Sequence, residues 1–539
     1  MMPDTEQPDL DVIIVGAGPV GLAGALLLDR NGQKGIVIER GVVRSHHPKA
    51  RGIRQRASEL VKLWGFDSAL RRVAMPDETH RFIYTETLSG EEIARTTPAD
   101  VEPVSWSSTR QYRVAQDHLE KILEDQLRAE ARTFEVHRGR KVVAIDQDNE
   151  GVTATVEDSN GSRSTVRSKY LIAADGVNSS VRAMLGLTLG DGGSSPYWHS
   201  VFWRGDLTDL TSHRPAIMYY TRTGGDSLVG IAPAGGENRW VTIVQHPAST
   251  ERPEPLSTND AISLIRTAVG RSDLEIEVVS SATFRISADV VDRYRIGRIF
   301  LAGDAAHSLP PTGGFGINTG FADIHNLAWK LAWVLEGKAP ESLLDSYESE
   351  RRPVALSNAA WSSTNARRFI GLKKALAAND RTEIARLVAE QSSHVDPTEQ
   401  DLGFSYVPLN DPARFAYERA AVGARAPHAT VHHGAVTRST LDVFEGQMSL
   451  VVGRQSGWLR AAELQQATPH LRSFVVGEDP LSGVDDSLES RFGLGDHGAT
   501  LVRPDGHVAW LELSDESAST ATFEEVLRQV LSRGISQSE

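Results

Sequence analysis

The sequence predicts an α/β fold with three parts: a Rossmann-type domain, a mostly antiparallel β-sheet domain and a smaller C-terminal α/β domain. Three observations lead to this prediction. A short apolar segment near the N-terminus runs into a glycine-rich turn and a helix. The middle of the chain alternates apolar and polar residues and is rich in aromatic side chains. The last quarter repeats short apolar segments before a closing helix.

Composition limits the size and class of the protein. The 539 residues exceed a single hydrophobic core, so we expect two to four domains. The net charge of −14 argues against nucleic acid as a partner. No apolar segment reaches the ~18 residues of a membrane span, and no signal peptide is visible, so we expect a cytoplasmic protein. The absence of cysteine excludes disulfides and thiolate metal sites, and no metal site is predicted.

A strand–turn–helix–strand unit stands near the N-terminus. Residues 10–15 are a short apolar strand, residues 20–30 a helix rich in leucine and alanine, and residues 35–38 a second strand. The turn is Gly16-Ala17-Gly18-Pro19-Val20-Gly21, the glycine pattern of a dinucleotide-binding site. A second copy of the pattern, at residues 493–498, has no strand before it, so we interpret it as a loop.

Each glycine of the first pattern has a physical role. Gly16 permits the tight turn, Gly18 lets the backbone approach a pyrophosphate, and Gly21 allows close packing of helix on strand. The helix N-terminus adds free N–H groups and a positive dipole end. Glu39 ends the second strand, where a carboxylate accepts hydrogen bonds from ribose hydroxyls and repels a 2′-phosphate. The site therefore suits FAD or NAD better than NADP.

Two later segments repeat the arrangement of an apolar strand that ends in an acid. One strand leads into Asp175-Gly176 and another into Gly303-Asp304. A glycine-rich segment over residues 305–320 follows, and a helix is predicted over residues 326–336. A helix N-terminus at that place would stabilise the negative charge of a reduced flavin.

With these motifs the chain resembles the class A, single-component FAD-dependent aromatic monooxygenases, in their phenol and polyketide hydroxylase branch. GAGPVG, AADGVNSSVR, GDAAHSLPPTGGFGINTG and ESERRP stand in the order of that family, and the resemblance covers nearly the whole chain. It implies bound FAD, with NADPH or NADH as a transient co-substrate. It also implies O2 activation through a flavin C4a-hydroperoxide, a small-molecule phenolic or polycyclic, polyketide-like aromatic substrate, and a homo-oligomer of two or more subunits.

The resemblance also implies roles for individual residues. Asp304 is expected at the ribityl hydroxyls, Asp175 beside the pyrophosphate, and Gln116, which begins a helix over residues 116–131, on the ribityl chain. The carbonyl of Pro311 is expected close to the substrate. The predicted cofactor contacts are Gly16, Gly18, Pro19, Gly21, Glu39, Arg40, Arg51, Gln116, Asp175, Gly303, Asp304, Pro311, Gly314, Gly316, Ile317 and Asn318.

Residues 40–56 concentrate positive charge, with six Lys or Arg and no acid. We favour an electrostatic trap for the phosphates of FAD and of the nicotinamide nucleotide over a solvated loop. By the resemblance, Arg51 is the arginine that binds FAD phosphate and borders the moving flavin, and Arg54 and Arg56 are neighbouring alternatives. The charge favours NADPH over NADH.

The segments predict a discontinuous arrangement of domains. The FAD-binding domain comprises residues 1–75, 105–185 and 284–370; the substrate-binding β-sheet domain 76–104 and 186–283; a helical and irregular connector 371–421, with a helical stretch at 372–391; and a thioredoxin-like domain without cysteine 422–539. The substrate-pocket candidates are Pro311, Phe315, Tyr219 and Tyr220, and many members of the family carry glutamine where this chain has Phe315. No residue is assigned as the base that activates the substrate.

Other functions are compatible with some of these features. Baeyer–Villiger oxygen insertion or alkene epoxidation would use the same flavin. A non-catalytic flavin-binding sensor belongs to another class, and a simple NAD dehydrogenase would be colourless.

Overall fold

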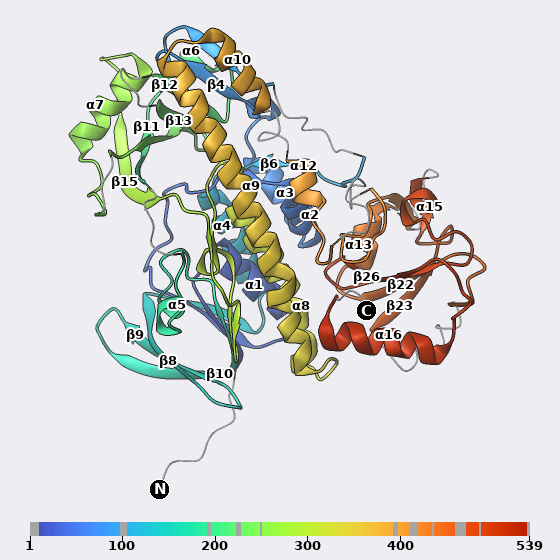
Figure 1. Cartoon of the computed structure of the whole chain (residues 1–539). Coiled ribbons are helices and arrows are strands. Elements are labelled where there is room, and N and C mark those ends of the chain that lie inside the picture. Colours follow the sequence, from blue (N-terminus) through green and yellow to red (C-terminus); the bar gives the residue numbers. More distant parts are fainter. Residues whose placement is uncertain are drawn as a thin grey trace.

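The computed structural model shows three α/β units, with one long helix running between the first two (Figure 1). An α/β fold with antiparallel sheets beside a Rossmann-type unit is therefore confirmed. None of the helices within the described ranges has the length and apolar character that crossing a membrane requires. The structure describes residues 10–97, 105–190, 196–222, 228–247, 251–391, 397–408, 418–433, 436–458, 470–483 and 487–535.

The first unit is built on an eight-stranded sheet. Its strands are β1 (Leu10–Val15), β2 (Gly35–Glu39), β7 (Phe134–Arg138), β8 (Arg140–Gln147), β9 (Val152–Asp158), β10 (Arg163–Ala173), β17 (Arg295–Ile296) and β18 (Ile299–Leu301). Neighbours in the order β18-β10-β1-β2-β7 are parallel, whereas β17 and the β8–β9 pair join antiparallel. The parallel strands β1 and β18 are apolar along consecutive residues because both faces of the sheet are buried there.

Helix α1 (Pro19–Arg30) packs on β1, β2 and β7, and α4 (Gln116–Glu130) and α8 (Gly316–Leu335) pack on α1. The sequence prediction started the last helix at Asn326, which was wrong. The glycine-rich segment is already helical at Gly316, because α8 crosses close to the turn after β18. A Cβ on Gly320 would collide with Val20 of α1, so glycine here permits helix contact rather than a loop.

The second unit is a seven-stranded sheet in the order β15-β11-β14-β13-β12-β4-β5, antiparallel except between β12 and β4. These strands are β15 (Glu277–Arg285), β11 (Tyr197–Arg204), β14 (Arg239–Gln245), β13 (Leu228–Pro233), β12 (Met218–Arg222), β4 (Phe82–Thr85) and β5 (Glu92–Arg95). Helix α7 (Thr258–Val269) covers one face and buries its apolar side there.

The long helix α9 (Ser346–Ala377) runs from α8 to the second sheet, where Arg222 of β12 donates to the carbonyl of Leu376 (2.8 Å) (Figure 1). A separate helix, α10 (Arg381–Glu390), follows. The predicted single stretch over residues 372–391 is thus two helices. Asn379 has φ 53° and the Asp380 side chain caps α10, which together end one helix and start the next.

The third unit has a four-stranded sheet in the order β23-β22-β25-β26. Its elements are α13 (Thr440–Phe444), β22 (Met448–Val452), β23 (Leu471–Val475), α15 (Ser487–Phe492), β25 (Ala499–Val502), β26 (Val508–Glu512) and α16 (Thr520–Arg533). Trp329 and Trp333 of α8 join its hydrophobic core, together with Phe523 of α16. The unit is therefore packed on the first one.

Short elements complete the described chain. They are β3 (Gly52–Ile53), α2 (Gln55–Leu63), α3 (Asp67–Val73), β6 (Tyr112–Arg113), α5 (Ser180–Met184), α6 (Thr208–Thr211), β16 (Asp289–Val290), β19 (His307–Ser308), α12 (Thr398–Leu402), β20 (Thr430–His433), β21 (Val436–Ser439), β24 (Ser482–Gly483) and three 3-10 turns, Asp77–Thr79, Gly303–Ala305 and Glu341–Asp345.

Candidate active site

The glycine turn after β1 is shaped for a phosphate ligand. Gly16 has φ 107°, and a Cβ there would collide with the carbonyl of Ala174, so only glycine fits. Gly18 is the N-cap of α1, and a Cβ built on it meets no atom within 4 Å. Pro19 begins the helix, and Gly21 packs on the carbonyl of Gly16. Open space therefore lies at the positive end of a helix, where an anion binds well.

Glu39 lies beside this turn at the end of β2. Its Oε2 accepts from the N–H of Ala17 (2.8 Å), and its Oε1 accepts from the N–H of Gly41 (2.7 Å). The carboxylate is thereby fixed against the turn and only partly exposed, as a ribose-binding acid requires. Arg40 follows it and is exposed.

Asp304 occupies a 3-10 turn after β18. Its side chain is open to solvent, yet the surrounding protein desolvates the carboxyl and raises its pKa, against the lowering effects of His307 and Lys49. A Cβ on Gly316, the first residue of α8, would lie 3.8 Å from Asp304 Oδ1. The carboxylate thus lies exposed beside a helix N-terminus, a position that fits a polyhydroxylated chain.

Two amides connect the segments around this space. Gln116 accepts from the N–H of Ala50 (3.2 Å) and donates to Glu120 (2.7 Å). Asn318 accepts from the N–H of Arg54 (2.9 Å) and donates to the carbonyl of Gly52 (3.0 Å). They hold residues 50–54 between α4 and α8, and the neighbouring Gly314, Gly316 and Ile317 are partly exposed.

Asp175 is engaged within the protein. Its Oδ2 accepts from the N–H groups of Ser180 (2.7 Å) and Val181 (3.2 Å) at the start of α5. Its Cα lies against the Gly16 turn, because a Cβ on Gly16 would collide with it. Arg182 of the same helix donates to the carbonyl of Ala305 (3.1 Å), which links this segment to the turn after β18 that carries Gly303 and Asp304.

The basic segment over residues 40–56 divides into separate parts. Arg56 pairs with Glu59 (3.0 Å) and donates to the carbonyl of Asp505 (3.1 Å), so it faces the third unit. Arg54 is buried and donates to the carbonyl of Gly313 (2.8 Å). The prediction of a single phosphate trap was therefore too broad, since tertiary partners hold these cations away from solvent.

The two tyrosines of β12 point to opposite faces of the second sheet. Tyr219 is buried in the core beneath α7 and donates to the carbonyl of Arg214 (2.8 Å). Tyr220 stacks on Tyr84, with ring centroids 5.3 Å apart, and contacts Phe369 of α9. Alternation along a strand explains the difference.

The segment before α8 presents one exposed residue and one buried one. Pro311 is exposed. Phe315 is only 2% exposed and packs edge-on against Trp361 of α9, with ring centroids 5.3 Å apart. An aromatic side chain at this position thus serves packing between the loop and α9.

A buried ionic group that we did not predict supports the turn at Gly303. Asp323 Oδ2 is 2.8 Å from His307 Nε2 and accepts from the N–H of Gly303 (3.2 Å), while Oδ1 accepts from Arg351 (2.9 Å). Although burial alone would raise it, His307 and Arg351 hold the pKa of Asp323 below its usual value. The sequence feature that could have indicated this group is an acid inside the apolar sequence FADIHNLAW.

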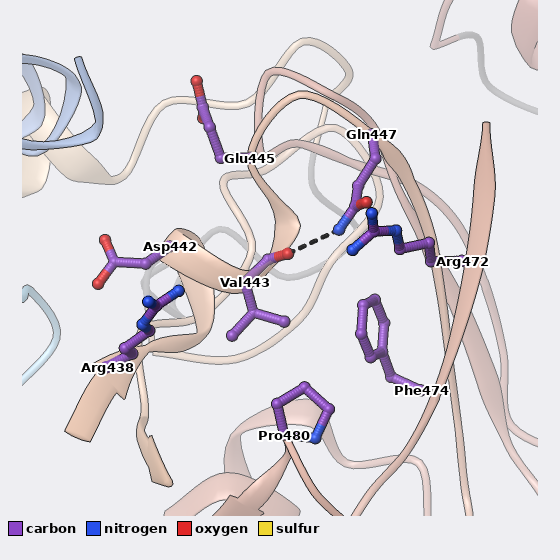
Figure 2. A pocket seen from close by; sticks show the side chains of 8 residues that line it. All are labelled: Arg438, Asp442, Val443, Glu445, Gln447, Arg472, Phe474 and Pro480. Carbon is purple, nitrogen blue, oxygen red and sulfur yellow. Dashed lines mark hydrogen bonds between the residues drawn. The ribbon is translucent and has the colours of Figure 1, made fainter. Parts of the chain in front are cut away.

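A separate pocket of about 250 Å³ lies in the third unit (Figure 2). None of the predicted cofactor contacts lines it. Gln447 donates to the carbonyl of Val443 (2.8 Å), and Asp442 pairs with Lys62 of the first unit (3.0 Å), so two of its polar groups are already engaged. The lining residues are Arg438, Asp442, Val443, Glu445, Gln447, Arg472, Phe474 and Pro480.

Comparisons with known proteins agree with the geometry. A family model described as an FAD binding domain matches residues 9–362, and one described as an aromatic-ring hydroxylase C-terminal domain matches residues 419–534. A 4-methyl-5-nitrocatechol 5-monooxygenase from Burkholderia sp is 34% identical, over 98% of both chains. An aklavinone 12-hydroxylase from Streptomyces purpurascens is 32% identical, over 97% of this chain and 99% of the relative. The flavin-dependent monooxygenase PieE, solved with FAD and substrate, superposes with a TM-score of 0.88 at 28% identity, over 98% of this chain and 100% of the other.

Proposed function

The chain belongs to the FAD-dependent aromatic-ring hydroxylases, and on that premise we propose that it hydroxylates a polycyclic, polyketide-like phenol with NADPH and O2. The family includes polyketide and phenol monooxygenases. Two features of the structure together support the proposal. Gly18, Glu39 and Asp304 form a cradle in the first unit, and an aromatic face of the second sheet, with Tyr220, lies in contact with α9.

The residues of the cradle fit FAD. The turn at Gly18 would hold the pyrophosphate, Glu39 the adenosine ribose, and Asp304 the ribityl chain. FAD, when bound, supplies reduction by a nicotinamide nucleotide and activation of O2. The protein contributes position, charge and exclusion of water.

The N-terminus of α8 has an electrostatic role. The helix begins at Gly316 without a side-chain cap and without an acid in its first turn. Its free N–H groups and dipole therefore stabilise negative charge that develops beside them. Asp304 lies next to this end, because a Cβ on Gly316 would lie 3.8 Å from its Oδ1.

We propose NADPH as the reductant because Arg40 and Lys49 are the exposed cations of the basic segment, available to a 2′-phosphate. We also propose that the protein is a homo-oligomer. Light scattering after size-exclusion chromatography measures the number of subunits. A KM for NADPH below that for NADH supports the first proposal, and equal values contradict it.

The test of the function combines a cofactor measurement with a product measurement. We expect purified protein to carry FAD, to consume NADPH faster when a phenol is added, and to yield a product heavier by one oxygen atom. Insertion of oxygen beside a ketone, or an epoxide from an alkene, would instead support the rival chemistries. NADPH consumption that no aromatic compound stimulates would favour a sensor.

A matched pair of variants tests whether the cradle binds FAD. Asp304→Asn should weaken FAD binding about tenfold, since a charge-assisted hydrogen bond to a hydroxyl is lost. Asp292→Asn removes an acid whose side chain is 94% exposed, and should leave FAD affinity unchanged. Colourless protein that cannot be reconstituted with FAD would contradict the proposal.

A further inference from the structure

We propose that the pocket in the third unit is a second ligand site, which binds a small aromatic carboxylate between Arg438 and Arg472 (Figure 2). This inference does not rest on the proposed function, because none of the predicted cofactor contacts lines the pocket. The pocket lies where β21 and α13 meet β23, which is the edge strand of the four-stranded sheet.

The floor of the pocket is aromatic and is held in place by packing. Phe474 is 9% exposed and belongs to a hydrophobic core of the third unit. Its ring packs against that of Phe444 at the end of α13, with ring centroids 6.1 Å apart. Val443 and Pro480 extend this apolar surface, and both are half-buried (Figure 2). The floor therefore offers a fixed apolar surface on which a planar ring can pack.

Two arginines form the rim of the pocket, and both are exposed. Arg472 and Phe474 lie two residues apart on β23, so alternation along the strand places both side chains on the same face of the sheet. Arg438 reaches the pocket from β21. Figure 2 shows the two guanidinium groups on opposite sides of the pocket. A ligand on the phenylalanine ring would thus lie between two cations.

The rim arginines lack counterions. Within the described ranges of the chain, neither Arg438 nor Arg472 takes part in an ion pair or a side-chain hydrogen bond. Arg528, an exposed arginine of the same unit, differs because it pairs with Glu525 (2.5 Å). A guanidinium binds a carboxylate through two parallel N–H···O bonds. Two such groups without partners at one pocket therefore favour an anionic ligand.

The two acids of the pocket do not neutralise this rim. Asp442 pairs with Lys62 of α2 (3.0 Å) and accepts from the N–H of Ser439 (3.0 Å), so its charge is already compensated. Burial raises the pKa of Glu445 to about 7, and the cation that acts most on it is Arg56 of the first unit. Its carboxyl points away from the rim (Figure 2). The positive charge of the rim is therefore available to a ligand.

Size and composition together indicate the class of ligand. The volume of about 250 Å³ is below the range of about 300–1,000 Å³ that is usual for drug-sized ligands, so the pocket suits a molecule of one or two rings. The apolar floor favours a ring over an inorganic ion, and the arginines favour a carboxylate. A small aromatic carboxylate satisfies both requirements.

The experiment titrates the full-length, FAD-loaded enzyme with 2-naphthoate in a calorimeter. This compound has the rings and the carboxylate but lacks the phenol on which the proposed hydroxylation acts. We expect one saturable binding event that leaves the flavin absorbance band unchanged. Arg438→Gln and Arg472→Gln should each weaken this binding about tenfold, since each removes charge-assisted hydrogen bonds. Arg472→Lys should restore part of the affinity, because the charge returns without the planar fork.

Arg528→Gln is the matched control. Arg528 is an exposed arginine of α16 in the same unit, and it does not line the pocket. The control should bind 2-naphthoate as tightly as wild type does. Circular dichroism and Tm show whether each variant is folded.

The outcomes separate the site from its alternatives. Absence of saturable binding by wild type, or unchanged binding by folded Arg438→Gln and Arg472→Gln, overturns the site. The arginines would then serve only to keep the edge of the sheet from pairing with other chains. Acetate or inorganic phosphate that binds as tightly as 2-naphthoate contradicts the aromatic class of ligand. Arginine-dependent binding by an enzyme that hydroxylates no phenol upholds the site and contradicts only the proposed function.

Discussion

His307 Nε2 lies 2.8 Å from Asp323 Oδ2, and neither side chain has any exposed surface. The same oxygen accepts from the N–H of Gly303, one residue before Asp304. Asp323 thus connects α8 to the turn that carries the predicted ribityl ligand. Arg351 of α9 completes the pairing on the other oxygen, so two helices fix this turn.

Asp323→Asn should destabilise the protein and weaken FAD binding. The amide keeps the shape but leaves Arg351 buried without a counterion, which costs about 3 kcal/mol in free energy of unfolding. Urea unfolding and FAD titration measure the two effects. The control Asp345→Asn breaks a pair with Arg295 whose acid is 74% exposed, and should change stability by less than about 1 kcal/mol. Equal effects of the two variants would contradict the role of Asp323.

A second buried group joins the third unit to α8 and α9, and it predicts a pH dependence. Glu350 accepts from Arg503 (2.5 and 2.9 Å) and from Lys330 (2.7 Å). Burial would raise the pKa of Glu350, but Arg503 and Lys330 lower it from 4.5 to about 2. Because the folded-state pKa lies below the unfolded value, this stabilisation is complete above the unfolded value and is lost as the pH falls towards the folded one.

Glu350→Gln should therefore remove part of the acid sensitivity. Wild-type protein should lose roughly 3 kcal/mol through this group between about pH 5 and about pH 2, and the variant should lack that component. Urea unfolding across this range measures it. Glu341→Gln, at a 50% exposed partner of Arg295, should retain the wild-type slope. Parallel slopes for wild type and Glu350→Gln would contradict the prediction.

Gly16→Ala tests the turn after β1. The added Cβ collides with the carbonyl of Ala174 and also forces φ 107° on a residue with a side chain, so we expect loss of bound FAD and a lower Tm. Gly32→Ala is the control, because its φ of 78° imposes similar strain while its Cβ meets no atom within 4 Å. It should cost about 1 kcal/mol and leave FAD affinity unchanged. Retention of FAD by Gly16→Ala would show that the turn tolerates a side chain.

Local patterns were sufficient to predict the fold class. The glycine turn, the acids at strand ends and the alternation over residues 186–283 each depend on neighbouring residues, and the α/β fold is confirmed. The start of α8 was missed because the helicity of Gly316–Gly320 depends on contact with α1, which no local preference reveals.

Most contacts that support the site could not be predicted from sequence patterns. Glu350 meets Arg503 across a long separation in sequence, and Arg113 meets Gly52 only through strand pairing. The sequence did signal polar residues inside an apolar helix, Asp323, Asn326 and Lys330, but could not identify their partners. The basic segment over residues 40–56 also divides into separate contacts only in the folded chain, so the sequence could not identify its partners.

Replacing each tyrosine of β12 by phenylalanine should separate stability from substrate recognition. Tyr219→Phe leaves the buried carbonyl of Arg214 without its donor, so we expect a loss of about 1 kcal/mol in stability and an unchanged KM for phenols. Tyr220 lies beside Arg51, and burial raises the pKa of its hydroxyl to about 12, so it stays neutral and able to donate. Tyr220→Phe should raise KM several-fold with little change in Tm. A reversed pattern would place the substrate on the α7 side of the sheet, since the two hydroxyls lie on opposite faces.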